Sequence, residues 1–238
     1  MRSTFTRARR ALRIFAPRAC VVASAEAIGP DLRRVRFAGD ELRALAPISP
    51  GQQVSVLVEG AWPVGGRNYS IAASASDASW VEIIAHLHGA GAGARAFARF
   101  EPGDRAKIWG PGGGFVFPQD GLQRVYLGDE SALGTFLSVL AHEPTSVAWL
   151  SVEAGESARA VGAIDPRLFA VERGGHDPHS HRRDSQLLEA VRGTLSERQV
   201  RYIIAGRTRS CHQLRLALLE AGVPAERISV RAFWTDRS

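Results

Sequence analysis

The stretch PQDGLQ, Pro118–Gln123, separates two halves of the chain that carry different hydrophobic patterns. Before it, apolar residues alternate with polar ones, as in QVSVLV (Gln53–Val58), which is the period of half-buried β-strands. After it, short apolar strands alternate with helical segments, which is typical of parallel βαβ units. The break predicts an all-β domain over residues 18–120 and an α/β domain over residues 121–238.

The first domain is expected to be a small antiparallel barrel, because closing the sheet leaves no strand edge exposed. Gly93–Phe100 (GARAFARF) is the segment of this half that favours a helix. The six expected strands are Ala19–Ala27, Leu32–Phe37, Gln53–Val58, Asn68–Ala73, Val81–His88 and Arg105–Trp109.

The second domain is expected to be Rossmann-like, with helices on both faces of a parallel sheet and ligands at the carboxyl ends of its strands. Arg173–Asp184 (RGGHDPHSHRRD) is polar and turn-rich, so it is expected to be an exposed loop. The expected strands are Arg124–Leu127, Ser146–Val152, Leu168–Val171, Arg201–Ala205 and Arg227–Ala232, and the expected helices are Ala132–Ala141, Ser185–Arg192 and Cys211–Ala221.

Composition and charge place the chain among globular proteins with a basic surface. Its 238 residues are 45% apolar and 23% charged, with a formal net charge of +6. The arginines are scattered, which argues against a nucleic-acid partner, and the absence of a run of about 18 apolar residues argues against a membrane span. Two distant cysteines, Cys20 and Cys211, favour a reduced, cytoplasmic protein. Residues 1–17 carry five arginines and are expected to be a solvated basic tail, with a targeting or anionic-surface segment as the alternative.

Three short clusters could carry chemistry, and each also has a purely structural explanation. Arg67–Ala72 (RNYSIA) sets a phosphate-binding guanidinium beside a flat phenol ring and a hydroxyl, or is a strand with one exposed arginine. His86–Ala98 (HLHGAGAGARAFA) places small residues before a helix, where open N–H groups can bind phosphate, or is a flexible turn. Tyr126–Gly134 (YLGDESALG) has two acids after a strand, which could equally cap the next helix.

Taken in this order, the clusters resemble the siderophore-interacting protein family, which are FAD-binding ferric-siderophore reductases of the ferredoxin-reductase-like superfamily. RNYSIA is similar to R-x-Y-T-x-R, with Ser70 for threonine and Ala72 for the second arginine. HGAGAGARAFA is similar to H-G-x-x-G-P-A-x-x-W-A, with Gly93 for proline and Phe97 for tryptophan. The remaining segments similar to the family are Gly103–Gly114, LGDESAL (Leu127–Leu133), Arg33–Leu42 and the terminal Phe233–Trp234.

The resemblance implies a flavin site in the barrel. Arg67 would contact the FAD pyrophosphate, Tyr69 would stack on the isoalloxazine, and Ser70 would bond near its N5. The loop His88–Ala94 would present amides to the pyrophosphate, and Gly93, in place of proline, is expected to loosen this loop. The full set of FAD-binding residues implied in this way is Arg67, Asn68, Tyr69, Ser70, His86, His88, Ala92, Gly93, Ala94, Asp129, Ser131, Ala132 and Trp234.

The resemblance also implies NADPH or NADH as electron donor, bound by the second domain. The candidate site is AGRTRSCHQLR (Ala205–Arg215), where a strand gives way to a helix. Its arginines could bind the 2′-phosphate of NADPH, or could simply be a solvated helix start. The residues implied here are Gly206, Arg207, Arg209 and Arg215, and a ferredoxin-type protein is the alternative donor.

In this interpretation the flavin carries the chemistry, so neither a catalytic side chain nor a metal site is expected. His176, His179 and His181 have metal-like spacing, but in a polar loop they are expected to be solvated. The leading hypothesis is a monomeric FAD-dependent reductase that passes electrons from NAD(P)H to a ferric siderophore. Two alternatives stay open: a flavin reductase of the same fold with another acceptor, and a non-catalytic module that keeps the barrel and binds a partner through its basic surface.

Overall fold

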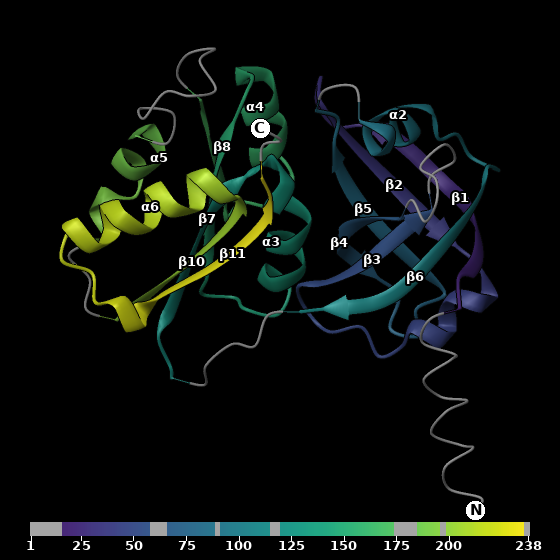
Figure 1. Cartoon of the computed structure of the whole chain (residues 1–238), viewed down its shortest axis with the longest axis horizontal. Coiled ribbons are helices and arrows are strands. Elements are labelled where there is room, and N and C mark those ends of the chain that lie inside the picture. Colours follow the sequence, from purple (N-terminus) through teal and green to yellow (C-terminus); the bar gives the residue numbers. More distant parts are fainter. Residues whose placement is uncertain are drawn as a thin grey trace, which may run out of the picture. The chain divides into compact units, whose positions relative to one another are not determined.

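The chain forms two compact units, which are described separately below (Figure 1). The division falls between Val116 and Phe117, and the turn Ile28–Leu32 is grouped with the second unit. Apart from Ala16 and Pro17, the expected basic tail falls outside the described residues, as do the three histidines of the polar loop. The structure, a computed structural model, describes residues 16–57, 66–88, 91–114, 120–173, 185–195 and 199–235.

The first unit is a closed six-stranded barrel, which confirms the architecture predicted from the alternating pattern. Its strand order is β1-β2-β5-β4-β3-β6, and neighbouring strands pair antiparallel (Figure 1). The strands are β1 Arg18–Ala27, β2 Leu32–Ala38, β3 Gln52–Leu57, β4 Gly66–Ser74, β5 Trp80–His86 and β6 Arg105–Gly113.

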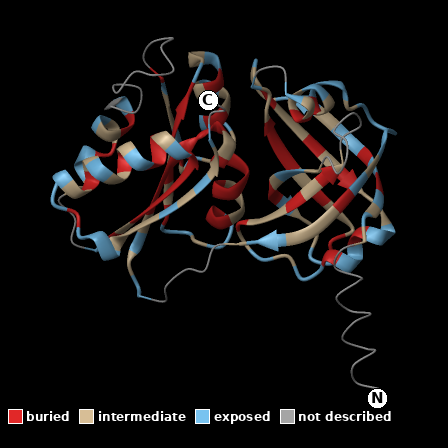
Figure 2. Cartoon of the chain, viewed as in Figure 1, coloured by how far each residue is buried: buried red, intermediate tan, exposed pale blue. Residues whose placement is uncertain are grey.

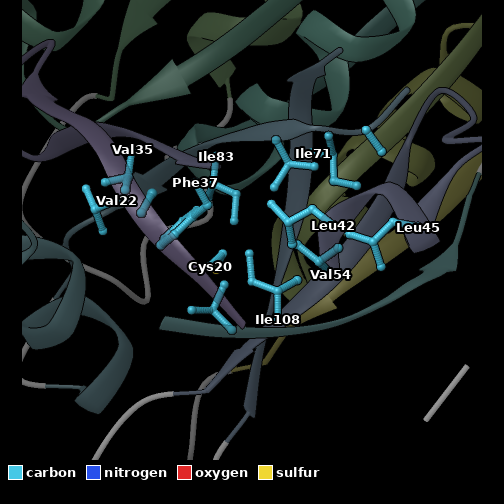
Figure 3. Packing of buried hydrophobic residues seen from close by; sticks show 14 of the residues in the cluster. Cys20, Val22, Val35, Phe37, Leu42, Leu45, Val54, Ile71, Ile83 and Ile108 are labelled. Carbon is cyan, nitrogen blue, oxygen red and sulfur yellow. The ribbon is translucent and has the colours of Figure 1, made fainter. Parts of the chain in front are cut away.

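The inward side chains of these strands form the core of the barrel (Figures 2 and 3). Val54 and Val56 are buried while Ser55 between them is not, because successive side chains of a strand point to opposite faces. The 3₁₀ helix η1 (Asp40–Leu45) adds Leu42 and Leu45 to the same cluster. The sequence pattern did not predict η1, because only two apolar residues of this short segment face the core.

The predicted helix of the barrel half is α2 (Ala92–Arg99), and aromatic contacts attach it to the barrel. Phe97 is fully buried, and its ring lies edge-on to Phe37 of β2, with ring centroids 6.1 Å apart. Phe100, just after the helix, also lies edge-on to Phe37, at 5.5 Å. This packing fixes α2 against β2, and Phe97 also contacts Tyr69 of β4, in the first of the three clusters.

The second unit is a parallel five-stranded sheet with helices on both faces, as predicted (Figure 1). Its order is β11-β10-β7-β8-β9, and all of its strand pairs are parallel. Helices α5 and α6 pack on one face, and α3 and α4 lie on the other (Figure 1). The elements are β7 Gln123–Asp129, η2 Glu130–Ala132, α3 Leu133–Leu140, β8 Val147–Val152, α4 Gly155–Gly162, β9 Leu168–Glu172, α5 Ser185–Ala190, η3 Arg192–Thr194, β10 Val200–Arg207, α6 Thr208–Glu220, η4 Ala225–Arg227 and β11 Ile228–Trp234.

Three details differ from the expectation for this half. Helix α4 was not predicted, because its sequence GESARAVG buries only Ser157 and Val161 and has no apolar stripe. Helix α6 begins at Thr208, three residues before the predicted Cys211. Arg173, expected in an exposed loop, is only 9% exposed. The rest of that loop, residues 174–184, lies outside the described residues.

Candidate functional site

In the first unit, β4 and the first turn of α2 bring together three of the predicted FAD residues. Arg67 and Tyr69 are two residues apart on β4, so their side chains leave the same face of the strand. A Cβ atom built on Gly93 would lie 2.3 Å from the Tyr69 hydroxyl oxygen and 3.3 Å from Cγ of Arg67. The first turn of α2 therefore packs directly against both side chains.

Tyr69 is seated against the aromatic core of the barrel. Its ring centroid lies 4.3 Å from that of Phe97, with the rings tilted by 43°. Burial raises the pKa of Tyr69 to about 12, although the neighbouring Arg67 guanidinium acts in the opposite direction. The phenol therefore stays protonated at neutral pH, and its hydroxyl remains a hydrogen-bond donor.

Gly93 has a structural role that the comparison with proline did not suggest. It lies in the first turn of α2, where its side-chain position is occupied by the Tyr69 hydroxyl. Real Cβ atoms do not approach other atoms as closely as 2.3 Å, so any side chain at this position requires Tyr69 to move. Glycine at this position leaves room for the Tyr69 hydroxyl.

The same corner offers positive charge and open N–H donors. Arg67 is exposed, its Nη1 donates to the Gly66 carbonyl at 3.4 Å, and it forms no ion pair with any other described residue. Helix α2 has no side-chain cap at its N-cap residue Gly91, and a Cβ atom built there meets nothing within 4 Å. Open amides, the helix dipole and a guanidinium favour an anion at this position. This donor set fits the pyrophosphate of FAD.

The other predicted residues of the first unit lie nearby on the same elements. Ser70 is buried in β4, and Asn68 is exposed and accepts a hydrogen bond from Ser55 of β3. His86 ends β5, two residues earlier than expected, and its ring centroid lies 5.3 Å from that of His88. Ala92 and Ala94 flank Gly93 in the first turn of α2.

In the second unit, the predicted residues gather at the carboxyl ends of β7, β10 and β11. Asp129, the last residue of β7, accepts hydrogen bonds from the Ser131 amide at 2.9 Å and from the Ser131 hydroxyl. Asp129 therefore caps η2, as the structural alternative for the acidic cluster stated. It also accepts a hydrogen bond from the Arg207 amide at 2.7 Å, which links β7 to β10. Ala132, at the end of η2, is fully buried.

The arginines predicted to bind NADPH differ in their exposure. Arg207 is only 3% exposed, and its guanidinium carbon lies 5.7 Å from the ring centroid of Trp234. Arg209 and Arg215 are half-buried on α6. Gly206, the second-last residue of β10, has a φ of +130°, and a Cβ built there would lie 2.5 Å from an Asp129 carboxylate oxygen.

A buried ion pair at the same edge of the sheet was not predicted. Arg173 Nη2 donates to Glu130 Oε2 and, at 2.8 Å, to the Ser151 carbonyl, and the two charged side chains are 6% and 1% exposed. The other Glu130 oxygen accepts a hydrogen bond from the Glu153 amide at 2.6 Å. The sequence carried no signal that pairs Glu130 with an arginine 43 positions away.

One protein-family model matches most of the first unit. Residues 19–117 match the family model described as "Oxidoreductase FAD-binding domain". No curated protein matches the chain. Among the described residues, no helix is both long and apolar enough to cross a membrane.

Solved structures share the fold of the whole chain. The siderophore-interacting protein of Acinetobacter baumannii superposes with a TM-score of 0.74 at 14% identity, over 93% of this chain and 92% of that one. A siderophore utilization protein from T. fusca gives 0.75 at 23% identity, over 92% and 93%. The ferredoxin reductase in carbazole 1,9a-dioxygenase gives 0.72 at 20% identity, over 92% of this chain and 70% of that one.

Residues 19–117 thus match an oxidoreductase FAD-binding domain, and the chain shares its fold with a ferredoxin reductase. The resemblance to siderophore-interacting proteins, drawn from its motifs, is confirmed at the level of this fold.

We expect Gly93→Ala to lower the free energy of unfolding by about 1–3 kcal/mol, because the new methyl group collides with the Tyr69 hydroxyl. Gly112→Ala in β6 is the matched control, because a Cβ there meets nothing within 4 Å, and should change stability by no more than about 0.5 kcal/mol. Urea denaturation measures both. Adding Tyr69→Phe to Gly93→Ala removes the colliding oxygen and should recover most of the loss. Equal effects at positions 112 and 93 would refute the close contact between Tyr69 and Gly93.

Arg173→Ala should destabilise the protein by about 3–5 kcal/mol, because it leaves the Glu130 carboxylate buried without its cation. Arg192→Ala is the control: it removes the exposed ion pair with Glu189, which should contribute less than about 0.5 kcal/mol. Chemical denaturation followed by circular dichroism gives both values. Replacing the pair together, with Glu130→Gln and Arg173→Met, should be milder than Arg173→Ala alone. If Arg173→Ala lowers the free energy of unfolding no more than Arg192→Ala, the buried ion pair does not stabilise the carboxyl edge of the sheet.

Proposed function

We propose that the protein is an FAD-dependent oxidoreductase that reduces ferric siderophores with electrons from NADPH or NADH. The observation that carries the proposal is the corner of the barrel where Arg67 and Tyr69 meet the open N-terminus of α2. That corner lies within the segment that matches an oxidoreductase FAD-binding domain.

Each side chain of the corner has a definite task. Arg67 and the amides of the first turn of α2 bind the pyrophosphate, since both supply donors to an anion. Tyr69, held by Phe97, presents a flat ring to the isoalloxazine, and Ser70 bonds near its N5. When bound, FAD supplies the conversion between a two-electron donor and a one-electron acceptor, which no side chain can perform. The protein contributes binding, orientation and positive charge.

The siderophore as acceptor is supported by the motif resemblance and by two structural neighbours described as siderophore-interacting and siderophore utilization proteins. Ferric siderophores are often anionic, and the chain carries a formal net charge of +6. A basic surface raises the encounter rate with an anionic substrate.

A reductase for a redox protein or another acceptor is the second candidate. It is supported by the shared fold of the ferredoxin reductase in carbazole 1,9a-dioxygenase. On either candidate, Arg209 and Arg215 are the half-buried arginines of α6 that could bind the 2′-phosphate of NADPH.

Spectra of the purified protein test the proposal directly. The protein reconstituted with FAD should be yellow, and anaerobic addition of NADPH or NADH should bleach it. Adding a ferric hydroxamate or catecholate siderophore should then restore the colour and release ferrous iron, measured with a ferrous chelator. Bleaching without iron release would favour the second candidate. A colourless protein that does not retain added FAD would support the non-catalytic partner-binding module instead.

Arg67→Ala should weaken FAD binding about 10- to 100-fold, because a charge-assisted hydrogen bond contributes about 1.5–3 kcal/mol. Arg99→Ala, which removes an exposed arginine from the last turn of α2, is the control and should leave the affinity unchanged. Quenching of flavin fluorescence on titration measures both, and circular dichroism checks that the fold is intact. Normal FAD content in Arg67→Ala would exclude Arg67 as the phosphate anchor.

A further inference from the structure

We infer that Asp129 and Arg207 are positioning residues that hold the indole of Trp234, and that neither binds a cofactor phosphate. The inference rests on the proposed function, because it concerns residues expected to bind FAD and NADPH. It follows from contacts within the second unit alone.

The three residues lie at the point where a ligand of such a sheet binds. From β7 the strand order runs to β8 and β9 on one side and to β10 and β11 on the other, so the switch point lies between β7 and β10. In open α/β sheets, ligands occupy the crevice outside the carboxyl ends of the strands at that point. Asp129 ends β7, Arg207 ends β10, and Trp234 ends β11.

The Asp129 carboxylate is already occupied by the chain itself. One oxygen accepts from the amide and the hydroxyl of Ser131, and the other accepts from the Arg207 amide at 2.7 Å. The side chain is buried, with the Asp129 residue 5% exposed, and it lies against Cα of Gly206, where a Cβ would be only 2.5 Å away. A carboxylate that already has three protein donors has no need of a further partner, and its negative charge repels a phosphate.

Ser131 links Asp129 to Trp234 through two hydrogen bonds. Its hydroxyl donates to Asp129 and accepts from the Trp234 indole Nε1 at 3.2 Å. The Trp234 carbonyl accepts from the Thr208 hydroxyl at 2.8 Å. The indole edge and the backbone of Trp234 are therefore both held by groups of the second unit.

Arg207 holds the face of the same indole. Its guanidinium carbon lies 5.7 Å from the ring centroid, within the range of a cation–π contact. The residue is only 3% exposed, and its amide is fixed by Asp129. Arg207 is thus buried beside Trp234, whereas Arg209 and Arg215 are half-buried and are the candidates for selecting NADPH over NADH.

Indole ¹⁵N NMR of the full chain tests, without any cofactor, whether Asp129 and Ser131 hold the Trp234 indole. Trp234→Phe assigns the Nε1–H resonance. Ser131→Ala should shift that resonance and speed its exchange with solvent by up to about tenfold, because the acceptor is lost. Ser131→Thr keeps a hydroxyl and should restore it. Ser138→Ala, two turns along α3, is the matched control and should leave it unchanged. An unchanged Trp234 resonance in Ser131→Ala would overturn the proposed link from Asp129 through Ser131 to Trp234.

Donor kinetics separate the roles of the arginines. Arg207→Met should move the Trp234 side-chain resonances and leave the ratio of KM for NADPH to KM for NADH unchanged. Arg209→Ala or Arg215→Ala should raise that ratio about tenfold and leave the Trp234 resonances in place. A selective rise of the NADPH KM in Arg207→Met would overturn the positioning role. If no variant or wild type oxidises either donor, the NMR arm still decides the inference, and only the proposed function fails.

Discussion

Two consecutive buried carboxylates, Asp129 and Glu130, organise the carboxyl edge of the parallel sheet. Asp129 ends β7, the central strand, Glu130 follows it, and the two side chains reach opposite sides of the strand. Asp129 binds the amide that ends β10, and through Ser131 it reaches Trp234 at the end of β11. Glu130 binds the amide after β8 and the Arg173 side chain after β9. The carboxyl ends of the other four strands are thus linked to these two residues, directly or, for β11, through Ser131.

The barrel depends on a close approach of a different kind. Its aromatic core holds Tyr69 against Phe97, and the Tyr69 hydroxyl occupies the place of a side chain at Gly93. This contact draws the start of α2 toward β4, so that the open amides of the helix and the Arg67 guanidinium share one corner. Gly93, expected from the sequence to loosen a loop, thus leaves room for the Tyr69 hydroxyl in the structure.

Prediction from the sequence succeeded where a periodic pattern was long and failed where structure depended on distant partners. The barrel strands and the parallel sheet follow from alternation and from βαβ spacing, so they were predicted close to their observed bounds. Helix α4 was missed because its own residues are mostly small and show little apolar periodicity. Arg173 was assigned to an exposed loop because polar neighbours surround it in sequence, whereas its partner Glu130 comes from another strand end.

The sequence by itself determined the two fold classes and the motifs that resemble an FAD-binding reductase. It did so because hydrophobic period and turn residues act over short distances along the chain. Only the tertiary structure decided which of these residues remain accessible to a ligand. Arg67 lies exposed beside open amides, whereas the Asp129 carboxylate is bound by the Ser131 hydroxyl and the Arg207 amide, and the buried Arg207 guanidinium lies over Trp234. Side chains of the same type differ in role because burial and hydrogen bonding are set by partners remote in sequence.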